Sequence, residues 1–177
     1  HTLIATATAS ASATLSFTSG INSTYDVYEF HFENIHPATD GATFSFQVNI
    51  VGNGAYAEPI TSTTFNAYHN EADSGAGLAY NTSGDQAQGT AFQHLSPSAA
   101  DADQSSSGIL TLYGPSSTTY VKHFVAKANA STTTDYSYAR STAGYINVTA
   151  AVDEIRFKMT SGNIDAGQIK MYGIAKA

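Results

Sequence analysis

Three side chains with metal-binding chemistry alternate along one segment: His69, Glu71 and Asp73. Alternate residues of a β-strand share a face, so an imidazole and two carboxylates at this spacing could converge. With a further residue or a water they could hold zinc or another divalent ion. A polar loop explains the same spacing, and we favour it because the triplet matches no established metal-binding motif. We therefore expect no metal and no cofactor, and keep these three residues as the candidates if a metal does bind.

Other acidic residues form less specific patterns. Asp101 and Asp103 resemble the start of a calcium-binding loop, but the glycine and the terminal glutamate of an EF-hand do not follow. His31 falls on the polar face of its segment with Glu29 and Glu33, which favours a surface or interface position over a role as general base. A solvated turn and a polar strand face are the expected structures.

The sequence offers little for catalysis. No serine lies in a Gly-X-Ser-X-Gly elbow, and the absence of cysteine excludes thiol nucleophiles, disulfides and thiolate metal sites. A carboxylate pair for glycan hydrolysis needs only proximity in space, and its candidates are Glu29, Glu33, Glu71 and Asp73. We expect no enzymatic activity, with a glycan hydrolase as the remaining catalytic alternative.

Tyr136 and Tyr138 are the candidates for ligand binding. Because they alternate, they can share one face of a strand or of a loop tip. Tyrosine offers a large contact area and a hydroxyl at little cost in conformational entropy, which suits protein interfaces and stacking on sugars. We predict a contact site there, to which His69 and the loops between residues 52 and 107 contribute.

Strands must position these residues, because the dominant period of the sequence is two. Residues 27–33 and 43–50 each have one apolar and one more polar face, and we expect them to form a hairpin with an elaborated loop. A second hairpin is expected from residues 152–160 and 168–174. The remaining predicted strands, which bring the total to about nine, are 2–8, 13–18, 108–113, 118–127 and 145–149.

The middle of the chain, residues 52–107, is weakly periodic and rich in Ala, Gly, Ser and Asp. We expect long loops and short strands there, with a short helix at residues 63–72. No segment has the composition of a linker, so residues 1–177 are expected to form a single domain. Short antiparallel strands, each with one apolar face, predict an all-β fold: an antiparallel β-sandwich of the jelly-roll type.

Charge is sparse and mostly negative, with 7 Lys and Arg against 14 Asp and Glu and a net charge of -7. Nucleic-acid binding needs clustered cations, whereas these are spread singly between Lys122 and Lys176. No stretch approaches the about 20 apolar residues of a membrane span, and the opening segment lacks the pattern of a secretory signal. We therefore expect contact with neither nucleic acid nor membrane. A surface of hydroxyls and amides, with few lysines to protect strand edges, favours contact with other protein chains.

Three phrases occur together in this sequence: GINSTYDVY at residues 20–28, NIHPATD at 34–40, and SGNIDAG at 161–167. They resemble phrases of small virion proteins of tailed phages, especially phages of aquatic bacteria and cyanobacteria. The commoner pattern has Asp after Gly-Ile, where this chain has Asn22. The resemblance implies a virion structural protein, either a capsid decoration protein or a module of a tail or head fibre.

Composition and resemblance together predict a decoration or cement subunit that stabilises the virion by protein–protein contacts. Its partners would be itself, as a trimer or another homo-oligomer, and virion proteins such as the major capsid protein, with assembly in the host cytoplasm. Burial of on the order of 1,000 Å² or more against its neighbours would tie capsomers together. The alternative is a receptor- or glycan-binding fibre or tail module, which would contact a host-surface glycan through Tyr136, Tyr138 and His69.

Overall fold

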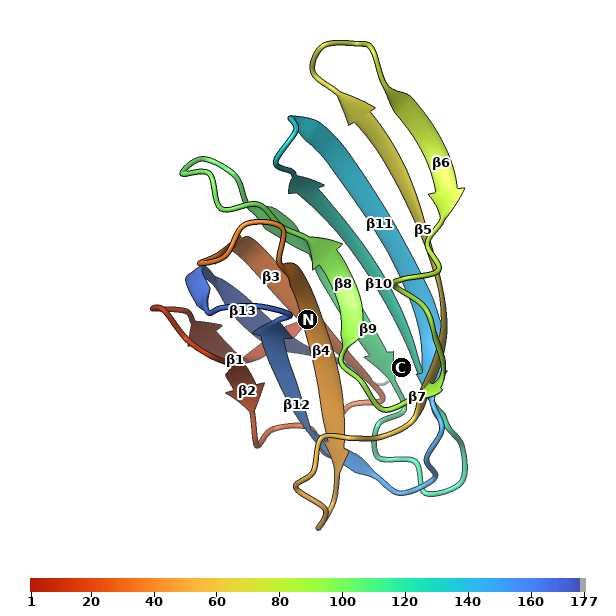
Figure 1. Cartoon of the computed structure of the whole chain (residues 1–177). Helices are drawn as coiled ribbons and strands as arrows, with labels where there is room; N and C mark the ends of the chain where they lie inside the picture. The colour runs from red at the N-terminus through yellow and green to blue at the C-terminus, as the bar shows by residue number, and fades with distance from the viewer. Residues whose placement is uncertain (176–177) are drawn as a thin grey trace.

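The computed structural model describes residues 1–175, and their regular structure consists of β-strands (Figure 1). The larger sheet has the order β1-β13-β3-β9-β10-β11-β5-β6, with β7 also paired to β5, and the smaller sheet has the order β2-β12-β4-β8. All strand pairs are antiparallel. Across the described residues there is no helix long and apolar enough to cross a membrane. The strands are β1 (Thr2–Thr8), β2 (Leu15–Phe17), β3 (Val27–Pro37), β4 (Thr43–Ile50), β5 (Ile60–Asn70), β6 (Ala76–Tyr80), β7 (Gln86–Gly89), β8 (Gln93–Pro97), β9 (Ser106–Tyr113), β10 (Lys122–Ser131), β11 (Tyr136–Ile146), β12 (Val152–Met159) and β13 (Ile164–Ile174).

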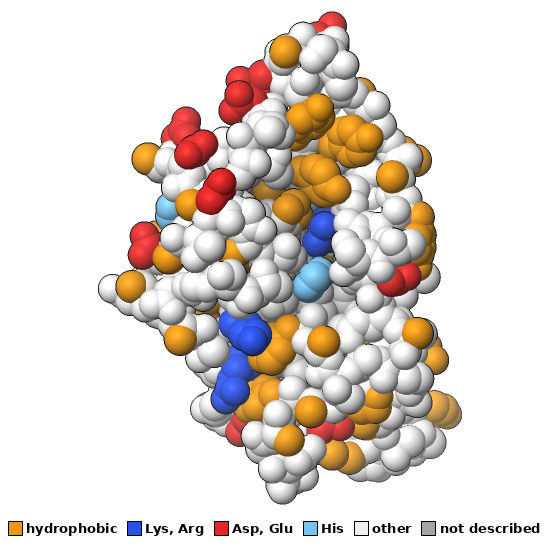
Figure 2. Space-filling model, in the orientation of Figure 1, with side chains coloured by type: hydrophobic (Ala, Val, Ile, Leu, Met, Phe, Trp, Pro, Cys, Tyr) orange, Lys and Arg blue, Asp and Glu red, His pale blue; other side chains and the backbone are white. Residues whose placement is uncertain are grey.

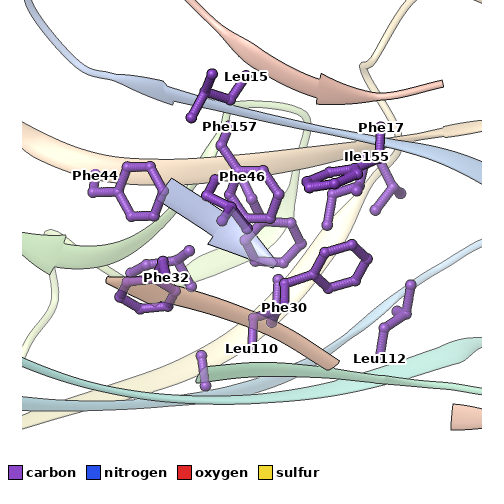
Figure 3. Close-up of a cluster of buried hydrophobic side chains, with 14 of the residues drawn as sticks. Leu15, Phe17, Phe30, Phe32, Phe44, Phe46, Leu110, Leu112, Ile155 and Phe157 are labelled. Carbon is purple, nitrogen blue, oxygen red and sulfur yellow. The ribbon is translucent and has the colours of Figure 1, made fainter. Parts of the chain in front are cut away.

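The two sheets pack face to face around one hydrophobic core, which is rich in phenylalanine (Figure 3). Phe44 stacks on Phe157, with ring centroids 5.6 Å apart and the planes 11° from parallel. Across the sandwich, Phe32 lies 5.2 Å from Phe44 and Phe30 lies 5.6 Å from Phe17. Each such pair contributes about 0.5–1.5 kcal/mol beyond the burial of its surface. The predicted antiparallel β-sandwich is confirmed.

The two predicted hairpins are wrong. β3 belongs to the larger sheet and β4 to the smaller one, while β12 belongs to the smaller sheet and β13 to the larger one. Each connection therefore crosses the sandwich from one sheet to the other, a connectivity that jelly rolls share. A strand shows the same alternation of apolar and polar residues in either sheet, because its apolar face points to the common core. The period revealed the strands but could not assign them to sheets.

The middle of the chain, where the sequence predicts long loops and short strands, contains four strands, of which β6, β7 and β8 are short and β5 has 11 residues. The helix predicted at residues 63–72 is wrong, because β5 runs through Asn70 and pairs along its whole length with β11. Of the strand predicted at 145–149, only residues 145–146 are strand, as the end of β11, which begins at Tyr136. The strand predicted at 118–127 begins only at Lys122.

A buried cation anchors the start of β10. The Lys122 side chain is fully buried, and its Nζ donates hydrogen bonds to the carbonyl oxygens of Tyr120 (2.9 Å), Thr149 (3.0 Å) and Val148 (3.2 Å). Burial lowers the pKa of Lys122, while these three acceptors satisfy the three donors of its ammonium group. The side chain thus ties the segment before β10 to the segment after β11.

Candidate ligand-binding face

Part of the inner face of the larger sheet extends beyond the smaller sheet. The smaller sheet ends at β8, which packs against β10 and β11, whereas β5 and β6 continue the larger sheet past β11. In Figure 1 the upper ends of β5, β6 and β11 project beyond the smaller sheet. We call this projecting part, residues 66–80 and 136–140, the overhang. Figure 2 shows hydrophobic side chains gathered in a hollow of the surface there, above a basic and a histidine side chain.

The inner faces of β5 and β11 change in character from the core to the overhang. The inner-facing pairs, in that order, are Ile60 with Ile146, Ser62 with Gly144, Thr64 with Thr142, Asn66 with Arg140, and Tyr68 with Tyr138. The first pair is apolar and fully buried in the core. Further along, Thr64 Oγ1 donates a hydrogen bond to Thr142 Oγ1 at 3.1 Å. The sheet therefore presents polar groups and then an aromatic surface where its cover ends.

The aromatic surface consists of three half-buried tyrosines, Tyr68, Tyr136 and Tyr138, which we call the tyrosine platform. Tyr68 stacks on Tyr138, with centroids 5.9 Å apart and planes 10° from parallel, and meets Tyr136 edge to face at 5.7 Å. Two glycines make room for the hydroxyl ends of these side chains. A Cβ atom at Gly77 would lie 2.6 Å from the Tyr68 hydroxyl oxygen, and one at Gly75 would lie 2.6 Å from that of Tyr136. The absence of a side chain at Gly75 and Gly77 thus leaves room for the two hydroxyl groups.

Arg140 lies beside the platform with one donor group unused. Its side chain is only 7% exposed, its Nε donates a hydrogen bond to Asn66 Oδ1 at 3.0 Å, and its guanidinium carbon lies 6.0 Å from the Tyr138 ring centroid. Its Nη1 is buried without a hydrogen-bond partner among the described residues. Burial lowers the pKa of Arg140, although an arginine stays protonated at neutral pH. Burial, and then the charge of Arg140, lower the pKa of His94 on β8, so this imidazole adds no competing positive charge.

A polar cavity of about 550 Å³ opens beside Tyr136. The turns between β5 and β6, between β8 and β9, and between β10 and β11 line it, and they contribute the carboxylates of Glu71, Asp101, Asp103 and Asp135. Gln104 also lines the cavity, and its Oε1 is buried without a hydrogen-bond partner among the residues described. The cavity is rich in acceptors, so it suits a ligand that carries hydroxyl or amide donors.

The structure places Tyr136 and Tyr138 on one face, as their alternation predicts, and adds two residues that the sequence interpretation missed. Tyr68 was missed because its segment was assigned to a helix. Arg140 continues the alternation of Tyr136 and Tyr138 along β11 and so shares their face, while cross-strand pairing places Asn66 beside it. The available signal was the alternation of Tyr136, Tyr138 and Arg140, which continues along the strand.

The other candidate, His69, lies on the outer face of β5, and it lines the polar cavity together with Tyr136. Its Nε2 is 3.0 Å from Asp73 Oδ1, and both side chains are more than half exposed. Glu71 and Asp73 follow the end of β5 and lie in a turn, where alternation no longer places residues on one face. Among the described residues, the one group of three metal-ligating side chains whose ligand atoms lie within 4.8 Å of one another is at a different place in the fold.

The carboxylates proposed for glycan hydrolysis fall into two separate places. Glu29 and Glu33 are on β3, and Glu71 and Asp73 are in the turn after β5, with β9, β10 and β11 between the two strands. Four steps of about 4.8 Å put β3 and β5 roughly 19 Å apart, which exceeds the about 5–9.5 Å between the carboxyl groups of a glycosidase. Hydrogen bonds from Lys170 and Gln168 also hold the pKa of Glu33 below its ordinary value.

Comparisons with protein-family models, with curated proteins and with solved structures found no match.

Proposed function

We propose that this chain is a glycan-binding module whose ligand lies across the tyrosine platform. The observation that supports this most directly is the pairing of three adjoining tyrosine rings with a buried arginine that has a free donor. Sugar rings present apolar C–H faces and hydroxyl edges, so a site for them needs both an aromatic surface and polar groups at its rim. The overhang supplies both on one face.

Hydrogen-bonding groups lie on two sides of the platform. On one side, Nη1 of Arg140 can donate to a ring oxygen, a hydroxyl or a carboxylate of the ligand, which would remove the cost of a buried donor without a partner. On the other side, the cavity beside Tyr136 offers the carboxylates of Glu71, Asp101 and Asp103 to sugar hydroxyls. A chain of two or three sugar units can reach both sides, so we expect an oligosaccharide rather than a monosaccharide.

The biological setting follows from the resemblance to virion proteins of tailed phages. A glycan-binding module of a fibre or tail would attach the particle to the carbohydrate of a host surface. Such a module is a virion structural protein by location and a receptor-binding protein by activity, and it performs no chemical step on its ligand.

Glycan-array screening of the purified protein, followed by titration of the best ligand, tests the proposal. Tyr138→Ala should weaken binding by about 2 kcal/mol, or about 30-fold, as expected for a tyrosine at the centre of a contact. Tyr120→Ala is the matched control, because Tyr120 is 74% exposed and precedes β10 at the end remote from the overhang. The proposal fails if no glycan binds, or if Tyr138→Ala binds the selected glycan as tightly as the unmodified protein.

A decoration or other self-assembling subunit is the second candidate, and the outer face of the overhang favours it. Leu78 and Tyr80 are 74% and 55% exposed there, and Phe65, which immediately precedes the overhang on β5, is 49% exposed. The three lie together because Phe65 pairs with Tyr80 and Ala67 with Leu78. β6 ends the larger sheet in the strand order, so its outer edge can pair with a second copy of the chain. A contiguous apolar patch beside an open edge is typical of an association surface.

Sedimentation velocity at increasing protein concentration tests this second candidate. We expect a homo-oligomer that Leu78→Lys converts to monomer, since the lysine would place a charge in the centre of the patch. A protein that stays monomeric at high concentration and does not bind phage capsids would rule the candidate out. The glycan-binding proposal would survive that result, because the platform is on the opposite face of the sheet.

A further inference from the structure

We propose that His1, Glu29 and His31 form a binding site for a divalent transition-metal ion, for which zinc is the best fit. Nε2 of His1 and Nε2 of His31 each lie 2.9 Å from Oε2 of Glu29. The three ligand atoms all lie within 4.8 Å of one another. Ligand atoms on a tetrahedral zinc ion are roughly 3.3 Å apart, given metal–ligand bonds of about 2.0–2.1 Å. Small side-chain rotations are therefore enough to close the site around an ion.

The three side chains lie on the outer face of the larger sheet, where β1, β13 and β3 are adjacent strands. Glu29 and His31 alternate on β3 with the buried Tyr28 and Phe30, so both point outward. His1 immediately precedes β1, and β13 lies between β1 and β3.

A tyrosine of the intervening strand supports both imidazoles. The Tyr172 ring lies 4.8 Å from the His31 ring and 6.2 Å from the His1 ring, measured between centroids. It thereby limits the rotation of both imidazoles and keeps them near Glu29. The site is thus organised by the sheet as well as by the hydrogen bonds to Glu29.

The charges around the group favour a cation. Glu29 supplies one negative charge, and neutral imidazoles supply none. The neighbouring ammonium of Lys170 is held by Glu33, whose two carboxylate oxygens each lie 3.0 Å from its Nζ. Two imidazole nitrogens and one carboxylate oxygen are a donor set that suits zinc, and also copper or nickel, better than calcium or magnesium. Because the three side chains are partly exposed, a water can take the fourth position.

The bound ion would fasten an edge strand. β1 ends the larger sheet in the strand order, and an ion held by His1 and by two residues of β3 links it to the body of the sheet across β13. Zinc should therefore stabilise the fold and protect β1 from local opening, since an ion that binds only the folded chain shifts the equilibrium towards it. The site is on the face of the larger sheet opposite the tyrosine platform and does not depend on the glycan-binding proposal.

Isothermal titration of the untagged protein with zinc chloride, after treatment with a chelator and its removal, tests the site. We expect one zinc ion per chain, and no comparable binding of calcium chloride. Glu29→Gln and His31→Ala should each weaken zinc binding at least about tenfold. Replacing a residue that only hydrogen-bonds to a metal ligand already lowers metal affinity by about tenfold or more, and these changes alter the ligands themselves. His69→Ala is the matched control, since His69 forms a similar pair with a carboxylate, Asp73, but no third metal-ligating side chain of residues 1–175 joins that pair.

Amide hydrogen exchange gives a second readout that does not depend on the affinity measurement. Zinc should slow exchange in Thr2–Thr8 of the unmodified protein and should not do so in the Glu29→Gln variant. If the His31→Ala variant does not fold, His1→Ala takes its place, because His1 lies outside the core. The proposal is overturned if the untagged protein binds no zinc, if Glu29→Gln and His1→Ala bind it normally, or if His69→Ala weakens binding equally.

Discussion

Replacing Gly77 by alanine tests the tyrosine platform without changing any of its members. The added Cβ would lie 2.6 Å from the hydroxyl oxygen of Tyr68 and 2.8 Å from its Cζ. Ordinary contacts of a Cβ atom begin at about 3.4 Å, so the end of the Tyr68 ring must move by roughly 1 Å. That movement disturbs the stack on Tyr138, which has a centroid distance of 5.9 Å.

The expected effect is a loss of affinity with little loss of stability. A favourable aromatic pair is worth about 0.5–1.5 kcal/mol, so a displaced platform should weaken glycan binding by about 1 kcal/mol, or about fivefold. In the folded state the variant loses part of the ring stacking, but replacing a glycine also reduces the entropy of the unfolded chain by about 0.4–1 kcal/mol. We expect the free energy of unfolding to change by less than about 1 kcal/mol.

Titration calorimetry with the selected glycan measures the affinity, and chemical denaturation measures the stability. The chain has eleven tyrosines and no tryptophan, so its near-ultraviolet circular dichroism reports on tyrosine packing. Leu78→Ala changes the adjacent residue on the outer face of the same strand and serves as the control. The role assigned to the platform would be refuted if Gly77→Ala altered the tyrosine signal but left the affinity unchanged, or if Leu78→Ala weakened binding as much.

Three further predictions concern stability. Lys122→Met should lower the free energy of unfolding by about 3 kcal/mol, because three carbonyls lose a buried donor; an effect below about 1 kcal/mol in urea denaturation would contradict this. Gly108→Ala should cost about 3 kcal/mol by the same measurement, since its Cβ would lie 2.3 Å from the Lys127 carbonyl oxygen and 2.6 Å from Phe32 Cζ, and a stable variant would show that the sheet yields there. Burial holds the pKa of His94 below its ordinary value, so the unfolded chain binds this proton at a higher pH and stability should fall as the pH drops below about 6.5. His94→Gln should reduce that fall in denaturation measured between about pH 5 and pH 7.5, and an unchanged pH profile would exclude the effect.

The limits of prediction from the sequence are clearest in β5. Its inner face begins with Ile60 in the core but continues with Thr64 and Asn66, and its outer face carries Phe65. Apolar and polar residues therefore exchange faces along the strand, because it leaves the cover of the smaller sheet part-way. A single period could not describe such a segment, and its rough spacing was interpreted as a helix. By contrast, residues 43–50 stay within the core along their length, and their predicted strand coincides with β4.

The candidate site shows the same division between local pattern and pairing. The alternation of Tyr136 and Tyr138 was enough to place them on one face, because both belong to one strand. Arg140 continues the same alternation on β11, whereas Tyr68 and Asn66 reach the site only through the register of β5 with β11, in which Tyr68 pairs with Tyr138 and Asn66 with Arg140. Register depends on the fold as a whole, so no local pattern in the sequence reports it.

The distribution of charge helps to select the kind of ligand. Several of the few basic residues are engaged within the fold: Lys122 by carbonyls, Arg156 and Lys158 over aromatic rings, and Lys170 by a carboxylate. The net charge of -7 therefore produces a mainly negative field, which disfavours the approach of nucleic acids and other polyanions. The free donor of Arg140 acts only on a ligand already in contact with the platform. A surface that repels polyanions at long range, and that offers one hydrogen-bond donor on contact, suits a neutral, hydroxyl-rich ligand. Salt should have little effect on the association of such a ligand, because no ion pairs form as it approaches. These are the properties of an oligosaccharide, and they separate it from the phosphate-bearing ligands that a buried arginine alone would also accommodate.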